Sequence, residues 1–230
     1  MGVEKAGLSE PPSLLVRPIV ILGGFLSGPS LYSNMRDWLE QATGQSVWIV
    51  GARIHDWWLS VSAEGWARLL DKLECVVDEA VGSSVTKKVT LIGHSSGGVI
   101  ARLFLSPRPF LGKSYCGLES VAQLITLGSP HYNERQGRMR QWVEKQYPGS
   151  FFASEGVCYT SVAGKVIHGR RQGSLRERWA YVFYERLSGD GNVWGDGLVP
   201  LSSQLLDGSQ QIVLDGVSHF TGFGGPWYGS

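Results

Sequence analysis

The stretch KVTLIGHSSGGVIARLFL, residues 88–105, decides the fold. KVTLIGH (88–94) is a short apolar run that is typical of a buried strand, and GGVIARLFL (97–105) is typical of a helix. Between them, GHSSG (93–97) follows the pattern G-x-S-x-G. In a nucleophile elbow, a sharp turn from strand to helix holds a serine at the edge of the sheet, and the flanking glycines prevent collisions. The stretch therefore predicts such an elbow, with a chance glycine-rich turn as the alternative.

Of the two serines in this motif, Ser95 is the predicted nucleophile, because Ser96 has no glycine two positions before it. Ser96 contributes only its backbone N–H, which points at the developing oxyanion from the helix N-terminus. The second oxyanion donor is expected in the loop after the first strand. In ILGGFLSG (21–28) the paired glycines allow close backbone approach, and the N–H of Phe25 can point into the site. The alternative for this loop is a glycine turn that merely clears neighbouring side chains.

Strand-like and helix-like segments alternate along the rest of the chain with short connections. This alternation predicts an α/β fold: one domain over residues 1–230, with a mostly parallel sheet and helices on both faces. The expected strands are residues 18–24, 46–50, 88–94, 121–130, 157–164 and 211–216, and the expected helices lie within 29–43, 66–80, 97–105 and 175–187.

Residues 129–157 interrupt this regular alternation with polar turns, aromatic residues and one expected helix over 137–147. An irregular insert in an otherwise regular α/β chain is a candidate lid or cap, because loops at the strand ends build the site. Whether this insert moves, and whether residues 1–13 are ordered, stays open.

A serine hydroxyl needs a base to accept its proton, and the chain has five histidines. In this fold the order serine, acid, histidine places the base after the last strand, and His219 satisfies that order. His94 is expected to point away from the serine and to pack structurally. His55 and His131 follow strand ends and could line the pocket, whereas His168 lies in what reads as a solvated loop.

The acid of the triad is expected between Ser95 and His219. Asp196 is the first candidate, because glycines flank it and a Val-Pro pair follows in GDGLVP. Its carboxylate would orient the imidazole and stabilise the charged form of the ring. The competitors are Asp190, Asp207 and Asp215, of which Asp215 is the strongest because it ends a strand.

Composition excludes several classes of function. The net charge of +1 gives no electrostatic footprint for nucleic acid. Three cysteines without CxxC spacing, Cys75, Cys116 and Cys158, predict free and mostly buried thiols. We expect no metal and no cofactor. The absence of a secretion signal or a transmembrane segment indicates a cytoplasmic or stromal protein. Transient contact with a membrane surface and the oligomeric state stay open.

With Ser95, Asp196, His219 and the glycine loop assigned, the chain resembles the lipase branch of the α/β-hydrolase superfamily. GHSSGG is similar to the GHSxGG elbow of bacterial triacylglycerol lipases, and LITLGSPH (124–131) is similar to a strand end shared by lipases and GPI inositol-deacylases. GDGLVP (195–200) resembles their acid loop. The whole chain, with its ending SHFTGFGGPWYGS, is similar to a group of lipase-like hydrolases of cyanobacteria and plastids.

Two features depart from the family pattern. Gly23 stands where the family carries a histidine that supports the oxyanion loop. The insert after Ser129 is short for a lipase lid, which weakens the case for long-chain triacylglycerols.

The leading hypothesis is a serine carboxylester hydrolase that acts on apolar or lipid-like esters through an acyl-enzyme. An acyltransferase or thioesterase with the same triad, an amidase, and a non-catalytic binding protein with this fold are the alternatives. The sequence leaves acyl length and head group open. Aromatic residues that could line an acyl pocket, or belong to the core instead, are Trp57, Trp58, Tyr132, Phe151 and Phe152.

Overall fold

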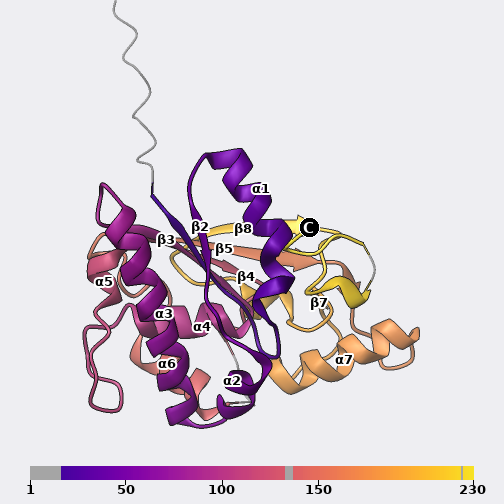
Figure 1. Ribbon diagram of the computed structural model, residues 1–230. Helices are drawn as coiled ribbons and strands as arrows, with labels where there is room; N and C mark the ends of the chain where they lie inside the picture. Colours follow the sequence, from indigo (N-terminus) through magenta and orange to yellow (C-terminus); the bar gives the residue numbers. More distant parts are fainter. Residues whose placement is uncertain (1–16, 133–136, 224) are drawn as a thin grey trace, which may run out of the picture.

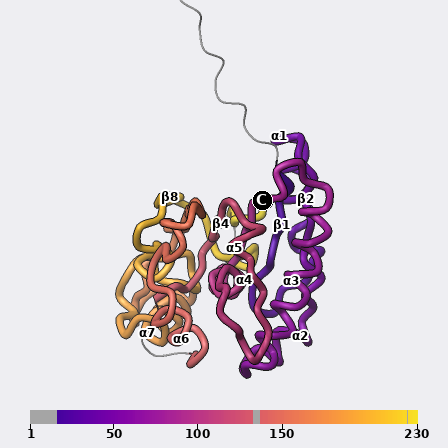
Figure 2. Tube along the Cα trace, turned by 90° about the vertical axis from the view of Figure 1, so that its left-hand side faces the viewer, coloured from indigo at the N-terminus to yellow at the C-terminus, as the bar shows by residue number. Residues whose placement is uncertain are grey.

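A six-stranded parallel sheet forms the centre of the molecule (Figure 1). The computed structural model describes residues 17–132, 137–223 and 225–230. The strand order is β2-β1-β3-β4-β5-β8, and Figure 2 labels β2, β1, β4 and β8 in this order from right to left. All neighbouring pairs are parallel. The strands are β1 Ile19–Leu22, β2 Val47–Ile49, β3 Val89–His94, β4 Val121–Leu127, β5 Cys158–Lys165 and β8 Gln210–Asp215.

The long helices lie where the apolar periodicity predicts them. They are α1 Ser33–Thr43, α3 Ala63–Ser83, α4 Ser96–Phe104, α6 Arg138–Gln146 and α7 Leu175–Ser188. Gly44 follows α1 in the left-handed conformation, with φ 66°, and ends the helix as expected. Shorter helices occupy the connections: η1 Pro29–Tyr32, α2 Ile54–Leu59, α5 Gly117–Ser120, α8 Leu201–Gln204 and η2 Thr221–Phe223.

Helices cover both faces of the sheet, and alternate side chains of a strand therefore belong to different cores. Val20 and Leu22 of β1 pack in a core that also contains buried residues of α3 and α4. Ile19 and Ile21 pack on the other face, in a core that includes Met35 of α1. Figure 1 shows α3 and α1 on opposite sides of the strands. This arrangement confirms the predicted fold class.

A small two-stranded sheet lies beside the main one and was not expected. It pairs β6 (Ile167–His168) with β7 (Trp194–Gly195) in antiparallel register. Strands of two residues are too short to produce an alternating pattern in the sequence. The small sheet matters for the site, because Asp196 follows β7 directly. His168 lies in β6 and not in a solvated loop.

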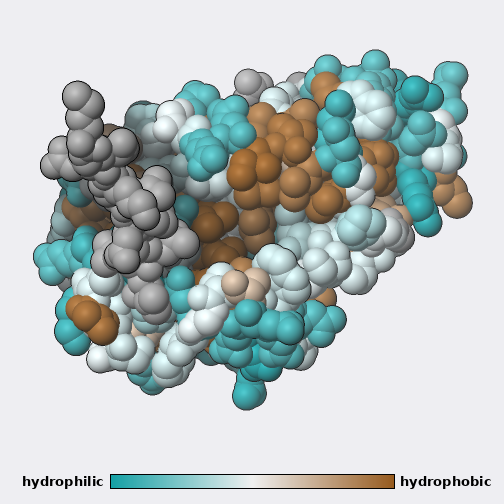
Figure 3. Space-filling view, turned by 90° about the horizontal axis from the view of Figure 1, so that it is seen from above, coloured by the Kyte–Doolittle hydropathy of each residue, from teal (hydrophilic) through white to brown (hydrophobic). Residues whose placement is uncertain are grey.

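Hydrophobic side chains are also exposed on the surface. In the view from above they gather in a band, with hydrophilic side chains around it (Figure 3). On the edge strand β8, Ile212 and Val213 are exposed.

The prediction of mostly buried thiols is wrong, since Cys75 and Cys158 are exposed and free in the described structure.

Candidate active site

Ser95 lies at a sharp turn between β3 and α4, and its backbone is in an unusual conformation. Its φ of 52° and ψ of −125° are rare for a residue with a side chain. The turn is tight enough that a Cβ on Gly93 would lie 2.4 Å from Cα of Gly98, and a Cβ on Gly97 would lie 2.3 Å from the carbonyl oxygen of Gly23. The glycines of the motif therefore permit the close approach that the elbow needs.

Asp196 and His219 form a hydrogen-bonded pair. Oδ2 of Asp196 lies 2.7 Å from Nδ1 of His219, and the backbone N–H of His219 donates to the carbonyl oxygen of Asp196. Oδ1 of Asp196 accepts hydrogen bonds from the N–H groups of Leu198 and Val199, at 3.0 and 2.8 Å. The carboxylate is fully buried and His219 is nearly so. Because Nδ1 is used by Asp196, Nε2 is the ring nitrogen that can accept a proton.

Tyr228, close to the C-terminus, completes the surroundings of Asp196. Its hydroxyl lies 3.1 Å from Oδ2 of Asp196 and 2.7 Å from Oε1 of Gln204. Burial, and then the charge of Asp196, raises the pKa of Tyr228, so this hydroxyl stays protonated. Gly128 has φ 55°, and a Cβ there would meet both Tyr228 and Asp196 within 2.8 Å. Sequence reasoning missed Tyr228 and Gln204, since nothing in the local pattern relates them to the acid.

The ring of His94 lies beside the ring of His219, with 4.8 Å between the ring centroids. His94 directly precedes Ser95, so this contact brings His219 to the elbow. Burial lowers the pKa of His94 well below its usual range, and the neighbouring His219 adds to this effect. His94 is therefore a neutral, buried packing residue, in keeping with the sequence-based expectation.

The loop after β1 lies against the nucleophile. A Cβ on Gly24 would lie 2.7 Å from Cβ of Ser95, so the backbone of this loop touches the serine. The two predicted oxyanion donors are the N–H groups of Phe25 and Ser96. Among the backbone hydrogen bonds of turns, loops and caps in the described part of the chain, neither N–H group is a donor. The Phe25 side chain is exposed, at 45%.

The insert after Ser129 is anchored to the body of the protein. In α6, Val143 is fully buried in the main core, and Glu144 makes a 2.7 Å ion pair with the buried Arg102 of α4. Nη2 of Arg140 donates a 2.8 Å hydrogen bond to Oγ of Ser96. Sequence reasoning assigned no role to Arg140. The side chain of Ser96 therefore has a partner from the insert, in addition to the predicted role of its N–H.

The structure separates the aromatic residues that the sequence suggested for substrate contact. Trp57 and Phe152 are buried in the main core, which places them with the packing residues. The hydroxyl of Tyr132 accepts a hydrogen bond from the N–H of Asp207 at 3.0 Å. Phe151 is exposed and packs edge-on against Phe152, with ring centroids 5.0 Å apart. Phe151 is exposed and Tyr132 is half-buried, and contact of either residue with a substrate stays a prediction.

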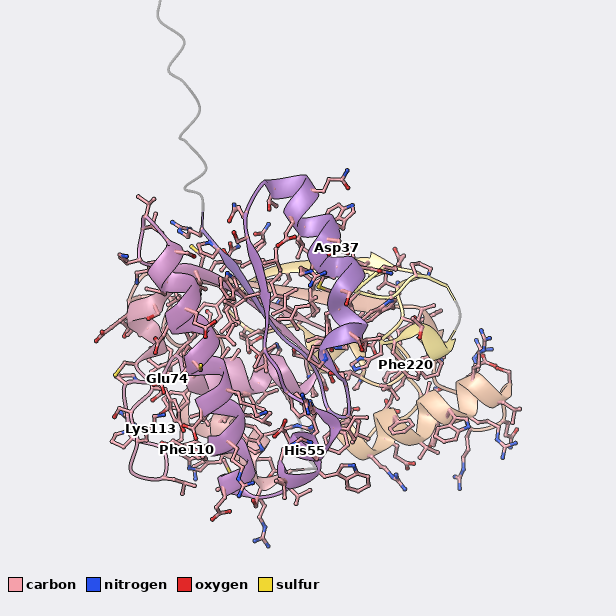
Figure 4. All side chains as sticks on the ribbon, viewed as in Figure 1. Asp37, His55, Glu74, Phe110, Lys113 and Phe220 are labelled. Carbon is pink, nitrogen blue, oxygen red and sulfur yellow. The ribbon has the colours of Figure 1, made fainter. Side chains whose placement is uncertain are left out.

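An open cavity of about 530 Å³ lies beside the loop after β1. It is lined by Gly28, Arg53, Ile54, His55 and Trp58. Ile54 and Trp58 of α2 are exposed apolar side chains. Figure 4 shows His55 on α2, and Nε2 of His55 lies 3.3 Å from Oδ1 of Asp56. His55 lines this cavity, and its place in the active-site pocket stays a prediction.

No hydrogen bond joins Asp196 or His219 to His131, His168 or Asp215 in the described part of the chain. His131 is completely buried, Nε2 of its ring lies 3.0 Å from Oγ1 of Thr126, and burial followed by the charge of Arg102 lowers its pKa. His168 packs against Trp194 in the small sheet. Asp215 is exposed and lies 3.7 Å from the ammonium of Lys165.

Over residues 17–132, 137–223 and 225–230 there is no group of three or more His, Cys, Asp or Glu side chains placed to hold a metal ion. None of the helices in these ranges has both the length and the apolar character that crossing a bilayer requires.

Comparisons with known proteins identify the fold. A family model described as the PGAP1-like alpha/beta domain matches residues 68–143, which is about a third of the chain. The mature lipase BlEst2 of Bacillus licheniformis superimposes with a TM-score of 0.59 at 18% identity, covering 94% of this chain and 89% of that one. A CIB-like hydrolase of Thermoplasma acidophilum gives a TM-score of 0.46 at 13% identity, covering 91% of this chain and 80% of that one. A search of curated protein sequences finds no match. The superposition on the Bacillus licheniformis lipase shows that the chain has the α/β-hydrolase fold.

Proposed function

We propose that this chain, which has the α/β-hydrolase fold, is a serine carboxylester hydrolase. The observation that carries the proposal is the buried pair of Asp196 and His219, 2.7 Å apart, beside an elbow that holds Ser95 in a strained conformation. A strained backbone persists only where the surrounding structure enforces it, and such residues cluster at active sites. The superimposed Bacillus licheniformis protein is described as a lipase, which agrees with this reaction class.

Each residue of the triad has one role in the proposed reaction. Nε2 of His219 takes the proton of the Ser95 hydroxyl as its Oγ attacks the ester carbonyl carbon. Asp196 holds the imidazole through Nδ1 and stabilises the imidazolium that forms. The protonated His219 then gives its proton to the leaving alkoxide, which departs as an alcohol and leaves Ser95 acylated. Water, deprotonated by His219, releases the acid and restores the serine.

The N–H groups of Phe25 and Ser96 form the oxyanion hole in this proposal. They lie on the two sides of the serine: one in the loop that touches Ser95, and the other in the first turn of α4. The positive end of the α4 dipole adds to the stabilisation of the negative charge that develops on the carbonyl oxygen. The guanidinium of Arg140, held 2.8 Å from the Ser96 hydroxyl, adds a fixed positive charge close by.

The proposed substrate is an ester with an apolar acyl or alcohol group. Ile54 and Trp58 of α2 are exposed and line the open cavity, and Phe25 is exposed on the loop that contributes Gly28 to this cavity. Apolar side chains around a concave surface are typical of sites that take an apolar ligand. Tyr132 and Phe151 are the other accessible aromatic candidates for contact with the acyl chain.

Hydrolysis of p-nitrophenyl esters of increasing acyl length tests this proposal. The wild-type protein is expected to hydrolyse these esters with a preference among acyl lengths, and Ser95→Ala is expected to lower kcat by several orders of magnitude. Ser96→Ala keeps the N–H and is the matched control, with a far smaller expected loss. Equal activity of wild type and Ser95→Ala contradicts the proposal. Transfer of the acyl group to an added alcohol in place of water would point to an acyltransferase.

A further inference from the structure

The hydroxyl of Tyr32 lies between the oxyanion loop and the residue that precedes the nucleophile. It accepts a 2.9 Å hydrogen bond from the N–H of Gly24 and lies 2.8 Å from Nδ1 of His94. It also lies 3.2 Å from Oγ of Ser27, which donates to the carbonyl oxygen of Gly24 at 2.6 Å. Only 1% of Tyr32 is exposed. The Tyr32 hydroxyl thus connects His94 of β3 with the N–H of Gly24 directly. It also connects His94 with the carbonyl oxygen of Gly24 through Ser27.

One assignment of protons is consistent with all the hydrogen bonds that Tyr32 makes. With Nδ1 of His94 protonated, that N–H and the N–H of Gly24 both donate to the Tyr32 oxygen, which has two lone pairs. The Tyr32 O–H then donates to Ser27, and Ser27 donates to Gly24. Burial keeps both side chains uncharged, because it lowers the pKa of His94 and raises the pKa of Tyr32. Hydrogen bonds between buried groups restrain the groups that they join, so this network limits the movement of Gly24.

The ring of Tyr32 also explains why residue 23 is a glycine. A Cβ on Gly23 would lie 2.6 Å from Cε2 of Tyr32 and 2.6 Å from Oγ of Ser27, so no other side chain fits. The family to which the sequence is similar carries a histidine at this position. In this chain the ring of Tyr32 fills the space beside Gly23, and Tyr32 belongs to η1 and not to the loop itself.

We propose that Tyr32 is a positioning residue that sets the oxyanion loop against the nucleophile. This inference rests on the proposed function. Gly24, which Tyr32 holds, contacts Ser95 and directly precedes Phe25, whose N–H is the proposed donor. A loop bonded at Gly24 has little freedom to move the N–H of the next residue. The oxyanion hole is therefore preorganised by a hydroxyl that touches neither the substrate nor the reacting atoms.

Tyr32→Phe removes the hydroxyl and keeps the ring that packs over Gly23. The matched control is Tyr115→Phe, which removes another hydroxyl of low exposure, bonded to the carbonyl oxygen of Ala67 and to Asp71 away from the site. The amide hydrogen of Gly24 is expected to exchange with solvent at least ~10-fold faster in Tyr32→Phe, because its acceptor is gone. Exchange at Gly24 is expected to stay unchanged in Tyr115→Phe. Equal exchange at Gly24 in Tyr32→Phe and wild type overturns the inference.

Ester hydrolysis supplies the second readout. Loss of loop position is expected to lower kcat by ~10- to 100-fold in Tyr32→Phe with KM within about twofold, since the oxyanion exists only in the transition state. The inhibition constant of an alkyl trifluoromethyl ketone, which forms a charged adduct with the serine, is expected to rise with the loss in kcat/KM. An unchanged kcat in Tyr32→Phe, or the same loss in Tyr115→Phe, overturns the inference. A wild-type protein that hydrolyses no ester contradicts the proposed function instead, and exchange at Gly24 still decides whether Tyr32 holds the loop.

Discussion

Oδ2 of Asp196 lies 2.7 Å from Nδ1 of His219, and the two residues also share a backbone hydrogen bond from the N–H of His219 to the carbonyl oxygen of Asp196. The pair is thus held by both side chain and main chain, although 23 residues separate them in sequence. The imidazole can hardly rotate without breaking its contact with the carboxylate.

Asp196→Asn is expected to lower kcat by about four orders of magnitude, because an amide in place of the carboxylate favours the wrong tautomer of His219. Asp215→Asn is the matched control, since Asp215 was the strongest alternative from the sequence and is exposed. It is expected to leave kcat within about twofold of wild type. Steady-state ester hydrolysis measures both variants. A larger loss in Asp215→Asn than in Asp196→Asn would contradict the assignment of the acid.

Ser95→Gly is expected to raise the melting temperature while it abolishes turnover. Glycine adopts a φ of 52° without the steric cost that serine pays there, and such strain is worth about 1–3 kcal/mol. Ser95→Ala keeps the Cβ and therefore the strain, so it is the control for loss of the hydroxyl alone. Calorimetric melting compares the three proteins. A lower melting temperature in Ser95→Gly than in Ser95→Ala argues against strain at this turn.

Gly93→Ala is expected to destabilise the protein by at least about 1–3 kcal/mol, because the new methyl group would overlap the backbone of Gly98. Gly82→Ala in α3 is the control. A Cβ on Gly82 meets no heavy atom within 4 Å, and alanine is favoured over glycine in helices by up to about 1 kcal/mol. Urea unfolding measures both free energies. Similar stabilities for the two variants would show that the contact between elbow and helix is looser than described.

Stability is expected to fall as the pH drops below about 6.5, the ordinary pKa of histidine. His94 and His131 have lowered pKa values in the folded protein, so the unfolded chain binds protons there that the folded chain does not. Each histidine then removes about 1.4 kcal/mol per pH unit, until the pH reaches its folded pKa. His131→Gln is expected to have a shallower loss of unfolding free energy between pH 6.5 and 5. The same slope in the variant and in wild type contradicts this account.

The sequence predicts those parts of the protein that depend on local pattern. The strand before Ser95, the helix after it and the stop at Gly44 each follow from apolar spacing and from glycine. The order of serine, acid and histidine selected His219, and the flanking glycines and the Val-Pro pair favoured Asp196 over three other aspartates; the structure brings the two residues together. Short elements such as β6 and β7 could not be predicted, because two residues carry no periodicity.

Contacts between segments that are distant in the chain could not be predicted from the sequence. Nothing in the local sequence around Tyr32 indicates that its hydroxyl meets Gly24 and His94, and Tyr228 reaches Asp196 only through the path of the C-terminal segment. The same limit explains why Trp57 and Phe152 were predicted as pocket residues although they lie in the core. An aromatic residue near a strand end can face a pocket or the core, and only the three-dimensional packing decides which. Arg140 reaches Ser96 from the insert for a similar reason.

The most direct test of the central claim is the covalent labelling of the protein by an alkyl fluorophosphonate, with the modified peptide identified by mass spectrometry. The proposed mechanism predicts one adduct per chain, on Ser95, that is absent in Ser95→Ala and retained in Ser96→Ala. An unlabelled wild-type protein, or an adduct that persists in Ser95→Ala, would contradict the assignment of Ser95 as the activated nucleophile.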